Sequence, residues 1–332
     1  MTRLVQLQNG RSRAVARVEE PRLRLLAGVE SVFQLAQEAL AEKIPLIELV
    51  GKKASGDTLE YDPIYQGKSD WKLRPAVDHP AEPARLLVSG TGLTHLGSAK
   101  NRQAMHAATA DETDSMKMFR WGVEGGKPAP GTIGIAPEWF YKGNGAILRA
   151  HGEALVSPPF AEDGGEESEI AGVYLIGPDG TPLRLGMAHG NEFSDHKFEK
   201  RNYLNLAGSK MRPCSLGPEL VLDPAFATVP GQVTIERAGQ ALWTKAITTG
   251  EDAMCHCLAN IEHHHFKFEP HRRPGDLHVH YYGACALSFG EGVQLAAGDV
   301  MVAEFSGFGR ALRNPLAVTP TVAAPLAVPI FP

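Results

Sequence analysis

The sequence has 332 residues, of which 43% are hydrophobic and 21% are charged, a composition typical of a globular protein. Its formal net charge of -5 gives no overall basic field that would favour nucleic acid or an anionic membrane surface. No apolar run approaches the roughly 20 residues of a membrane-spanning helix, and four cysteines are too few for a disulfide framework. We therefore expect a cytoplasmic protein that binds neither nucleic acid nor a membrane.

The first predicted elements are a β-hairpin and a helix. Residues 3–8 and 12–19 alternate apolar and polar side chains around Asn9-Gly10, a pair typical of a tight β-turn. Residues 29–43 repeat apolar side chains at helical spacing, which predicts an amphipathic helix.

A proline-rich stretch at residues 75–87 predicts a linker. We therefore place a small α/β N-terminal domain over residues 1–85 and a larger domain over residues 86–332. The larger domain carries many short apolar runs separated by Gly and Pro, which predicts a mainly β domain with some helices, an α+β fold. Two helices are expected, over residues 99–110 and 253–268.

One acidic stretch leads directly into an apolar strand. Five carboxylates lie within residues 162–169, and residues 170–176 are apolar. Glu167 and Glu169 share one face of the predicted strand, because successive side chains of a strand point to opposite faces. Such a pair is either a solvated turn or half of a divalent-cation site, since hard cations prefer carboxylate oxygens. Further candidate ligands are Glu192 and Asp195.

Other clusters favour structural interpretations. His263, His264 and His265 are adjacent, whereas two helical metal ligands need a spacing of four residues. Cys255 and Cys257 have no second cysteine pair to complete a zinc site. The glycine-rich stretches lack the pattern of a nucleotide-binding loop. Residues 111–122 have no clear period and form either a lid or a surface loop.

Six blocks, in this order along residues 85–316, resemble the fumarylacetoacetate hydrolase superfamily: GTGLTHLGSAKNR, PEWFYKGNGAIL, EESEIAGVYLIG, GNEFSDHKFEKRNY, SKMRPCSLGPELV and LAAGDVMVAEFSGFGRALRNPL. The amino-acid sequences of these blocks are most similar to those of the GguC-like branch, which is associated with bacterial sugar-acid metabolism. The resemblance implies a mixed β-roll or barrel-like C-terminal domain, a homodimer, and Mg²⁺ or Mn²⁺ chelated by a small-molecule 2-oxo acid substrate.

The resemblance also implies roles for individual residues. Glu167 and Glu169 match the family's E-x-E metal ligands, and Glu192 stands where the family has an aspartate. Lys210 matches the lysine that neutralises developing negative charge, and Lys142 matches a lysine on the substrate side. Glu162, Asp163 and Glu166 are then left as a solvated approach to the site.

Further matches concern the substrate and the chemistry. His95 matches the family's lid histidine, but Ser98 stands where many hydrolytic members have a glutamate. Ser194 belongs to the metal-binding block, and Gly283-Ala284 replaces a glycine-threonine pair. We expect Ser194, Gly283 and Ala284 to contact the substrate, together with His280, whose strand matches one near the family's active site. For His278 and His280 a structural role is the alternative.

These matches imply a metal-dependent hydro-lyase that converts a 2-keto-3-deoxy sugar acid, for example 2-keto-3-deoxypentonate to 2,5-dioxopentanoate. Lys210, Lys142 and His95 are the candidate catalytic residues, and any of them could move the proton. The first alternative is a hydrolase that cleaves a C–C bond in a 2,4-diketo acid. A non-catalytic sugar-acid binding protein and an enzyme that forms a Schiff base on a lysine are further alternatives.

Overall fold

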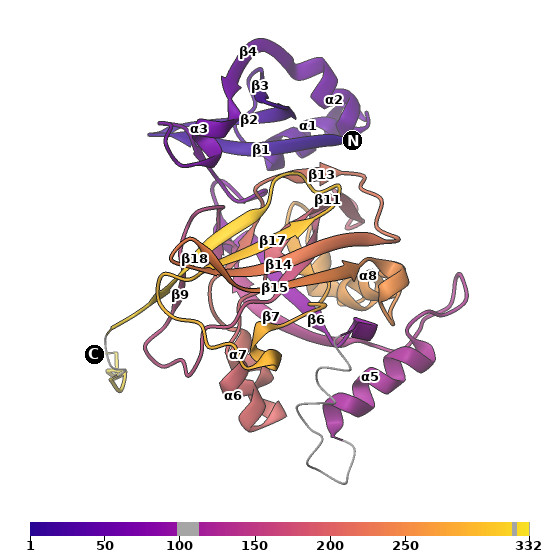
Figure 1. Cartoon of the computed structure of the whole chain (residues 1–332). Coiled ribbons are helices and arrows are strands. Elements are labelled where there is room, and N and C mark those ends of the chain that lie inside the picture. The colour runs from indigo at the N-terminus through magenta and orange to yellow at the C-terminus, as the bar shows by residue number, and fades with distance from the viewer. Residues whose placement is uncertain (98–112, 321–323, 332) are drawn as a thin grey trace.

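The computed structural model describes residues 1–97, 113–320 and 324–331 of the chain (Figure 1). Its helices are α1 Val32–Glu42, α2 Leu46–Lys53, α3 Tyr61–Tyr65, α5 Asp114–Gly125, α6 His196–Arg201, α7 Leu206–Lys210 and α8 Leu258–Phe266. The first nine strands are β1 Thr2–Asn9, β2 Ser12–Glu19, β3 Arg22–Leu26, β4 Ala54–Glu60, β5 Lys72–Leu73, β6 Leu86–Gly92, β7 Glu138–Asn144, β8 Leu148–Arg149 and β9 Leu155–Ser157. The later strands are β10 Ser168–Ile176, β11 Pro182–Asn191, β12 Cys214–Leu216, β13 Leu220–Leu222, β14 Val229–Arg237, β15 Gln240–Thr249, β16 Leu277–Tyr281, β17 Val300–Phe305 and β18 Leu312–Val318.

The strands form two sheets. The larger one runs in the order β4-β3-β2-β1-β13-β11-β10-β16-β6-β7, with the short strands β5, β8 and β12 attached beside this path. The smaller one has the order β15-β14-β17-β18-β9. Within the described residues neither sheet closes into a barrel, and the predicted mainly β fold with helices is confirmed.

The local predictions at the start of the chain are confirmed. Strands β1 and β2 pair as the expected hairpin. Helix α1 begins after Ser31, whose side chain accepts a hydrogen bond from the Gln34 amide and so satisfies one of the unpaired N–H groups of a helix start. Strand β1 also pairs with β13, and the first strands therefore extend the larger sheet (Figure 1).

The predicted helices later in the chain have three outcomes. The helix expected over residues 253–268 is present but shorter, as α8. The helix expected over residues 99–110 lies outside the described residues. Residues 111–122 were expected to be a lid or loop, yet from Asp114 onward they form α5, which begins at a Thr113 cap. The side chain of Thr113 accepts a hydrogen bond from the Met116 amide there. This cap stabilises the start of the helix, although the sequence shows no clear apolar periodicity.

Strand β10 lies inside the larger sheet and positions the acidic residues. All nine of its residues are buried, and it pairs antiparallel with β11 on one side and with β16 on the other. Burial on both faces explains its nearly continuous apolar sequence after Glu169. None of the described helices has the length and apolar character required to cross a bilayer.

Candidate metal centre

Three buried carboxylates meet where β10 begins and β11 ends. Glu169 lies in β10, Glu167 precedes that strand, and Glu192 directly follows β11. The antiparallel pairing of these strands brings the segments together, and the Glu192 amide donates a hydrogen bond to the Glu167 carbonyl at 2.8 Å. One carboxylate oxygen from each of the three glutamates lies within 4.8 Å of the other two. We call Glu167, Glu169 and Glu192 the acidic triad.

Lys210, at the end of α7, lies inside the acidic triad. Its Nζ donates hydrogen bonds to Glu167 Oε1 at 2.5 Å, to Glu192 Oε2 at 2.7 Å and to Ser194 Oγ at 3.0 Å. Burial alone would lower the pKa of the Lys210 ammonium, but the charges of Glu167 and Glu192 outweigh it and raise this pKa well above its ordinary value. Lys210 is therefore charged.

Lys142, in β7, also contacts the acidic triad. Its Nζ donates to Glu192 Oε1, to the Phe193 carbonyl at 3.1 Å and to the Lys210 carbonyl at 2.9 Å. An ammonium has three N–H groups, and these three acceptors use all of them. The side chain of Lys142 is also fully buried. Lys142 therefore has no N–H group left for a substrate in this arrangement.

Glu169 is the member of the triad that lacks a cationic partner. Its Oε2 accepts a hydrogen bond from the Gly283 amide at 2.7 Å, whereas its buried Oε1 has no partner among the described residues. Burial, together with the charges of Glu192 and Glu167, raises the pKa of Glu169 well above its ordinary value. A buried carboxylate oxygen without a partner is costly, and a divalent cation is one group that would satisfy it.

The chemistry of the acidic triad fits Mg²⁺ or Mn²⁺. The three side chains offer only oxygen ligands, which hard cations prefer, and one oxygen from each lies within 4.8 Å of the others. Glu167, Glu169 and Glu192 are the described residues that could hold such an ion.

The Gly283 amide is available to Glu169 because the backbone there adopts φ +107°, a conformation that side chains disfavour. A Cβ at this position would also lie 2.1 Å from Thr94 Oγ1, so only glycine fits. Gly283 therefore contacts the triad through its backbone, while Ala284 makes no hydrogen bond within the described residues.

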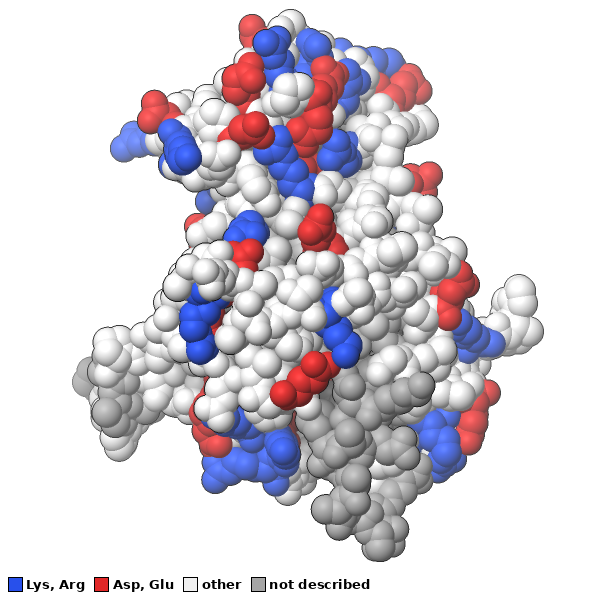
Figure 2. Space-filling view, viewed as in Figure 1, with Lys and Arg blue, Asp and Glu red and all other residues white. Residues whose placement is uncertain are grey.

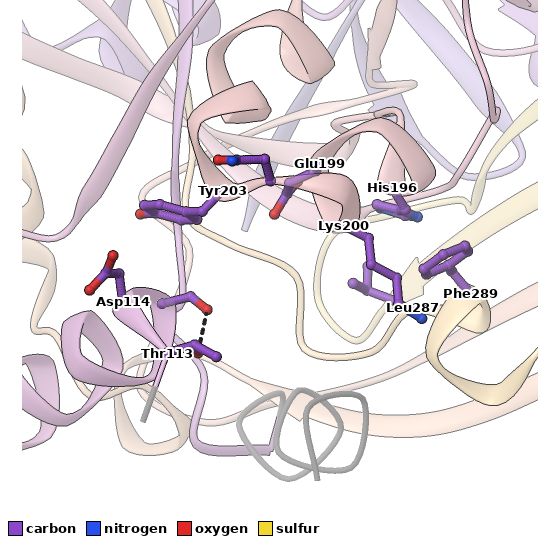
Figure 3. Close-up of a pocket in the computed structure, with 10 residues that line it drawn as sticks. Thr113, Asp114, His196, Glu199, Lys200, Tyr203, Leu287 and Phe289 are labelled. Carbon is purple, nitrogen blue, oxygen red and sulfur yellow. Dashed lines mark hydrogen bonds between the residues drawn. The ribbon is translucent and has the colours of Figure 1, made fainter. Parts of the chain in front are cut away.

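A pocket of about 400 Å³ lies beside the triad (Figure 3). Two of its lining residues connect it to the triad. His196 Nε2 lies 3.1 Å from Glu167 Oε1, and Glu199 Oε2 lies 3.9 Å from Lys210 Nζ. The pocket is lined by Thr113, Asp114, Ser115, His196, Glu199, Lys200, Asn202, Tyr203, Leu287 and Phe289.

Sequence reasoning missed His196 and Glu199. Both belong to α6, which begins after Asp195, where the Asp195 side chain accepts a hydrogen bond from the Phe198 amide. Residues three apart on a helix share a face, so this spacing after a capping aspartate was the signal that could have identified them. Asp195 itself bonds to Arg212 at 3.0 Å and is not part of the triad.

Strand β7 also presents Glu138 on the same face as Lys142, since alternate residues of a strand share a face. Glu138 Oε2 accepts a hydrogen bond at 2.9 Å from the hydroxyl of Tyr203, which lines the pocket. On the neighbouring strand, a Cβ at Gly92 would lie 1.8 Å from Glu138 Oε1, so glycine is required for this close approach.

The structure gives His95 and His280 hydrogen-bond partners outside the acidic triad. His95 Nε2 lies 2.7 Å from Thr249 Oγ1, and His280 Nδ1 lies 2.8 Å from Ser89 Oγ. Between these two histidines and the acidic triad, the described part of the chain shows no hydrogen bond or ion pair. Ser98 lies outside the described residues.

One expectation for the acidic approach is wrong. Glu166 is fully buried rather than solvated, and it accepts hydrogen bonds from the Ser288 amide at 2.6 Å and the Ser288 hydroxyl at 2.8 Å. These two bonds compensate the carboxylate for its lost hydration. They also tie the strand of the triad to the segment that supplies Leu287 and Phe289 to the pocket.

The architecture is that of an α+β protein with a buried acidic triad beside a pocket. Neither a scan of protein-family models nor a search of curated proteins found a match. Among solved structures, the apo form of 2-keto-3-deoxy-D-arabinonate dehydratase is similar with a TM-score of 0.70 at 17% identity, over 96% of this chain and 100% of that one. The same dehydratase complexed with magnesium and 2,5-dioxopentanoate gives 0.68 at 17% identity, over 96% and 99%.

A third similar structure is 2-hydroxyhepta-2,4-diene-1,7-dioate isomerase from Mycobacterium marinum, with a TM-score of 0.60 at 16% identity, over 97% of this chain and 100% of that one. The chain shares its fold with these enzymes along nearly its whole length. The fold that the sequence resemblance implies is thus confirmed.

Proposed function

We propose that the protein is a divalent-metal-dependent dehydratase of a 2-keto-3-deoxy sugar acid, for example one that converts 2-keto-3-deoxypentonate to 2,5-dioxopentanoate. The observation that carries this proposal is the buried acidic triad, with the unpartnered Glu169 Oε1, beside a pocket of about 400 Å³. The fold shared with 2-keto-3-deoxy-D-arabinonate dehydratase supports it.

Glu167, Glu169 and Glu192 would hold Mg²⁺ or Mn²⁺, which when bound polarises the ketone of a chelated 2-oxo acid and acidifies its C3 protons. Lys210 lies within hydrogen-bond distance of two of these carboxylates and stays charged. Its three N–H groups already bond to Glu167, Glu192 and Ser194, so in this proposal the ammonium acts through its charge, which stabilises the negative charge that develops on the ketone oxygen when the C3 proton leaves.

Dehydration breaks a C3–H bond and the C4–O bond, forms a C3=C4 double bond, and needs a proton so that the hydroxyl leaves as water. To reach the 2,5-dioxo product, a proton then moves from C5 to C3, and the resulting C5 enol takes a proton at C4 and loses its hydroxyl proton to become the aldehyde. We assign these proton transfers to His196 and Glu199, because both line the pocket and both contact the triad or Lys210. A carboxylate and an imidazole are the usual side chains for such steps. Lys142 is assigned to balancing the charge of Glu192, since it bonds to that carboxylate and none of its three acceptors lines the pocket.

Lys200 supplies a cationic side chain to the same pocket (Figure 3). We assign it to the hydroxyl groups of the substrate tail, while Leu287 and Phe289 form an apolar wall and help to exclude water. Figure 3 shows the three side chains together on one side of the pocket.

The hydrolase alternative is less well supported. Hydrolysis by a histidine-glutamate pair would use His95, but its ring is hydrogen bonded to Thr94 and Thr249 and makes no hydrogen bond to the triad within the described residues. Ser98 moreover occupies the position of the glutamate partner.

A turnover screen of 2-keto-3-deoxy acids tests the proposal. The purified protein would be supplied with Mg²⁺ or Mn²⁺, and products would be identified by mass. We expect one product per substrate, lighter by one water molecule, and no reaction after chelation of the metal. Two carbon fragments would support the hydrolase, and tight metal-dependent binding without turnover would support a binding protein.

A further inference from the structure

Residues 324–331, which we call the apolar arm, carry large hydrophobic side chains in full contact with solvent. The exposed fractions are 90% for Leu326, 84% for Val328, 95% for Ile330 and 93% for Phe331. Isolated exposed hydrophobic residues are common on proteins, but four within six positions form a contiguous apolar surface, which marks an interaction site.

The body of the protein does not hold the arm. Thr319, whose amide donates to the Ser157 carbonyl at 3.1 Å, is the last residue with a hydrogen bond in the described part of the chain. No charged residue occurs after Arg313. Figure 2 accordingly shows neither blue nor red on the segment that projects at the left edge. Pro325 and Pro329 lack an N–H, so the arm is suited to binding through its side chains rather than as a central strand.

The same protein carries an apolar groove of about 400 Å³ between α1, α2 and the strands β10 and β11. The groove offers leucine and isoleucine side chains, and the charged residues Arg184 and Asp223 also line it. Six residues characterise it: Leu40, Ile47, Leu175, Leu183, Leu185 and Leu222. Ile47 is 51% exposed there, so the groove is open to an incoming segment.

We propose that the apolar arm of one copy of this chain docks in the apolar groove of a second copy. Both surfaces are hydrophobic, and burying one against the other removes apolar area from water. In Figure 1 the arm leaves the lower left of the molecule, whereas α1 and α2 lie at its top, so a chain is poorly placed to fill its own groove. Reciprocal exchange of two arms gives a closed two-fold dimer.

Photo-crosslinking between distinguishable copies tests this inference. Phe331 would be replaced by p-benzoylphenylalanine, and the variant would be mixed with an isotopically heavy preparation of the unmodified protein. We expect crosslinks from the light arm to groove residues of the heavy copy, located by mass spectrometry. Crosslinks confined to one copy, or to surfaces of the second copy outside the groove, would overturn the proposal.

Two matched substitutions separate docking from general surface effects. Ile47→Glu places a charge in the groove, and Leu242→Glu places the same charge on β15, where Leu242 is 44% exposed outside the groove. We expect Ile47→Glu to lower the yield of intermolecular crosslinks about tenfold, because docking of the arm would then bury a charge in an apolar contact. Leu242→Glu should leave this yield unchanged. Equal yields for both variants would contradict arm docking. The outcome is independent of whether the protein is a dehydratase.

Discussion

Lys210 Nζ lies 2.5 Å from Glu167 Oε1, inside a cluster of three buried glutamates. Lys210 and Lys142 supply two positive charges against the three carboxylates, and Glu169 is left without a cationic partner. With all three carboxylates ionised, a divalent cation would turn an excess of negative charge into an excess of positive charge. This charge distribution fits the proposal that the centre holds a metal and then an anionic ligand.

The first prediction concerns Glu169. Glu169→Gln should abolish tight Mn²⁺ binding, because the triad loses a charged oxygen ligand. Without metal, the same variant should be at least as stable as the original protein, since it removes a buried carboxylate that lacks a partner. Titration calorimetry measures the first effect and urea denaturation the second.

Glu166→Gln is the matched control for that experiment. Glu166 lies in the same acidic stretch, but its carboxylate bonds to Ser288 and not to the triad. Mn²⁺ affinity should survive this change. Equal losses of affinity in both variants would argue against the assigned ligands.

The second prediction concerns Lys142. Lys142→Met should lower the free energy of unfolding of the metal-free protein by about 3–5 kcal/mol, because removing one partner of a buried ion pair leaves the other uncompensated. Urea denaturation measures this loss. Added Mn²⁺ should restore part of it, because the metal then compensates Glu192. A variant as stable as the original protein would contradict the role assigned to Lys142.

The third prediction concerns Glu199. If Glu199 moves a proton, Glu199→Gln should lower kcat by about 10²–10⁴-fold while KM changes little. The affinity for Mn²⁺ should stay the same, because Glu199 contacts Lys210 and not the triad carboxylates. Steady-state kinetics combined with calorimetry tests both statements, and a variant with unchanged kcat would remove Glu199 from the chemistry.

The fourth prediction concerns acid stability. Burial lowers the pKa of His189, His278 and His280 to about 3 each. The unfolded chain, with histidine pKa values of about 6.5, binds more protons below that pH than the folded one. The contribution of these three histidines to the free energy of unfolding is therefore largest above about pH 6.5. As the pH is lowered from about 6.5 to about 3, this contribution falls by about 1.4 kcal/mol per pH unit for each histidine.

Urea denaturation at a series of pH values tests this stability profile. His280→Gln should reduce the slope of the free energy of unfolding against pH by about one proton. A free energy of unfolding that stays constant from about pH 7 to about pH 5 would contradict neutral burial of these side chains.

The sequence predicted the parts of the fold that depend on local pattern. The Asn9-Gly10 hairpin, α1 and the short strands follow from turn residues and apolar periodicity. The predicted strand put Glu167 and Glu169 on one face and made them candidate ligands, although in the structure Glu167 lies just before β10. The family resemblance then made Glu192 the third candidate ligand, and the pairing of β10 with β11 brings Glu192 beside Glu167 and Glu169.

The remaining features depend on contacts between distant segments. Lys142 finds its acceptors at Phe193 and Lys210, and Glu166 finds Ser288, more than 100 residues along the chain. His95 is held by Thr249 from the other sheet. Spacing along the chain carries no signal for a contact such as that of Glu166 with Ser288, so the expectation of a solvated Glu166 was wrong.

The most direct test of the central claim is the mass of the product formed from 2-keto-3-deoxypentonate by the Mg²⁺-loaded protein. We predict a single product lighter than the substrate by one water molecule, formed by the original protein and by Glu166→Gln but not by Glu169→Gln. Pyruvate together with a second fragment, or full activity of Glu169→Gln, would contradict it.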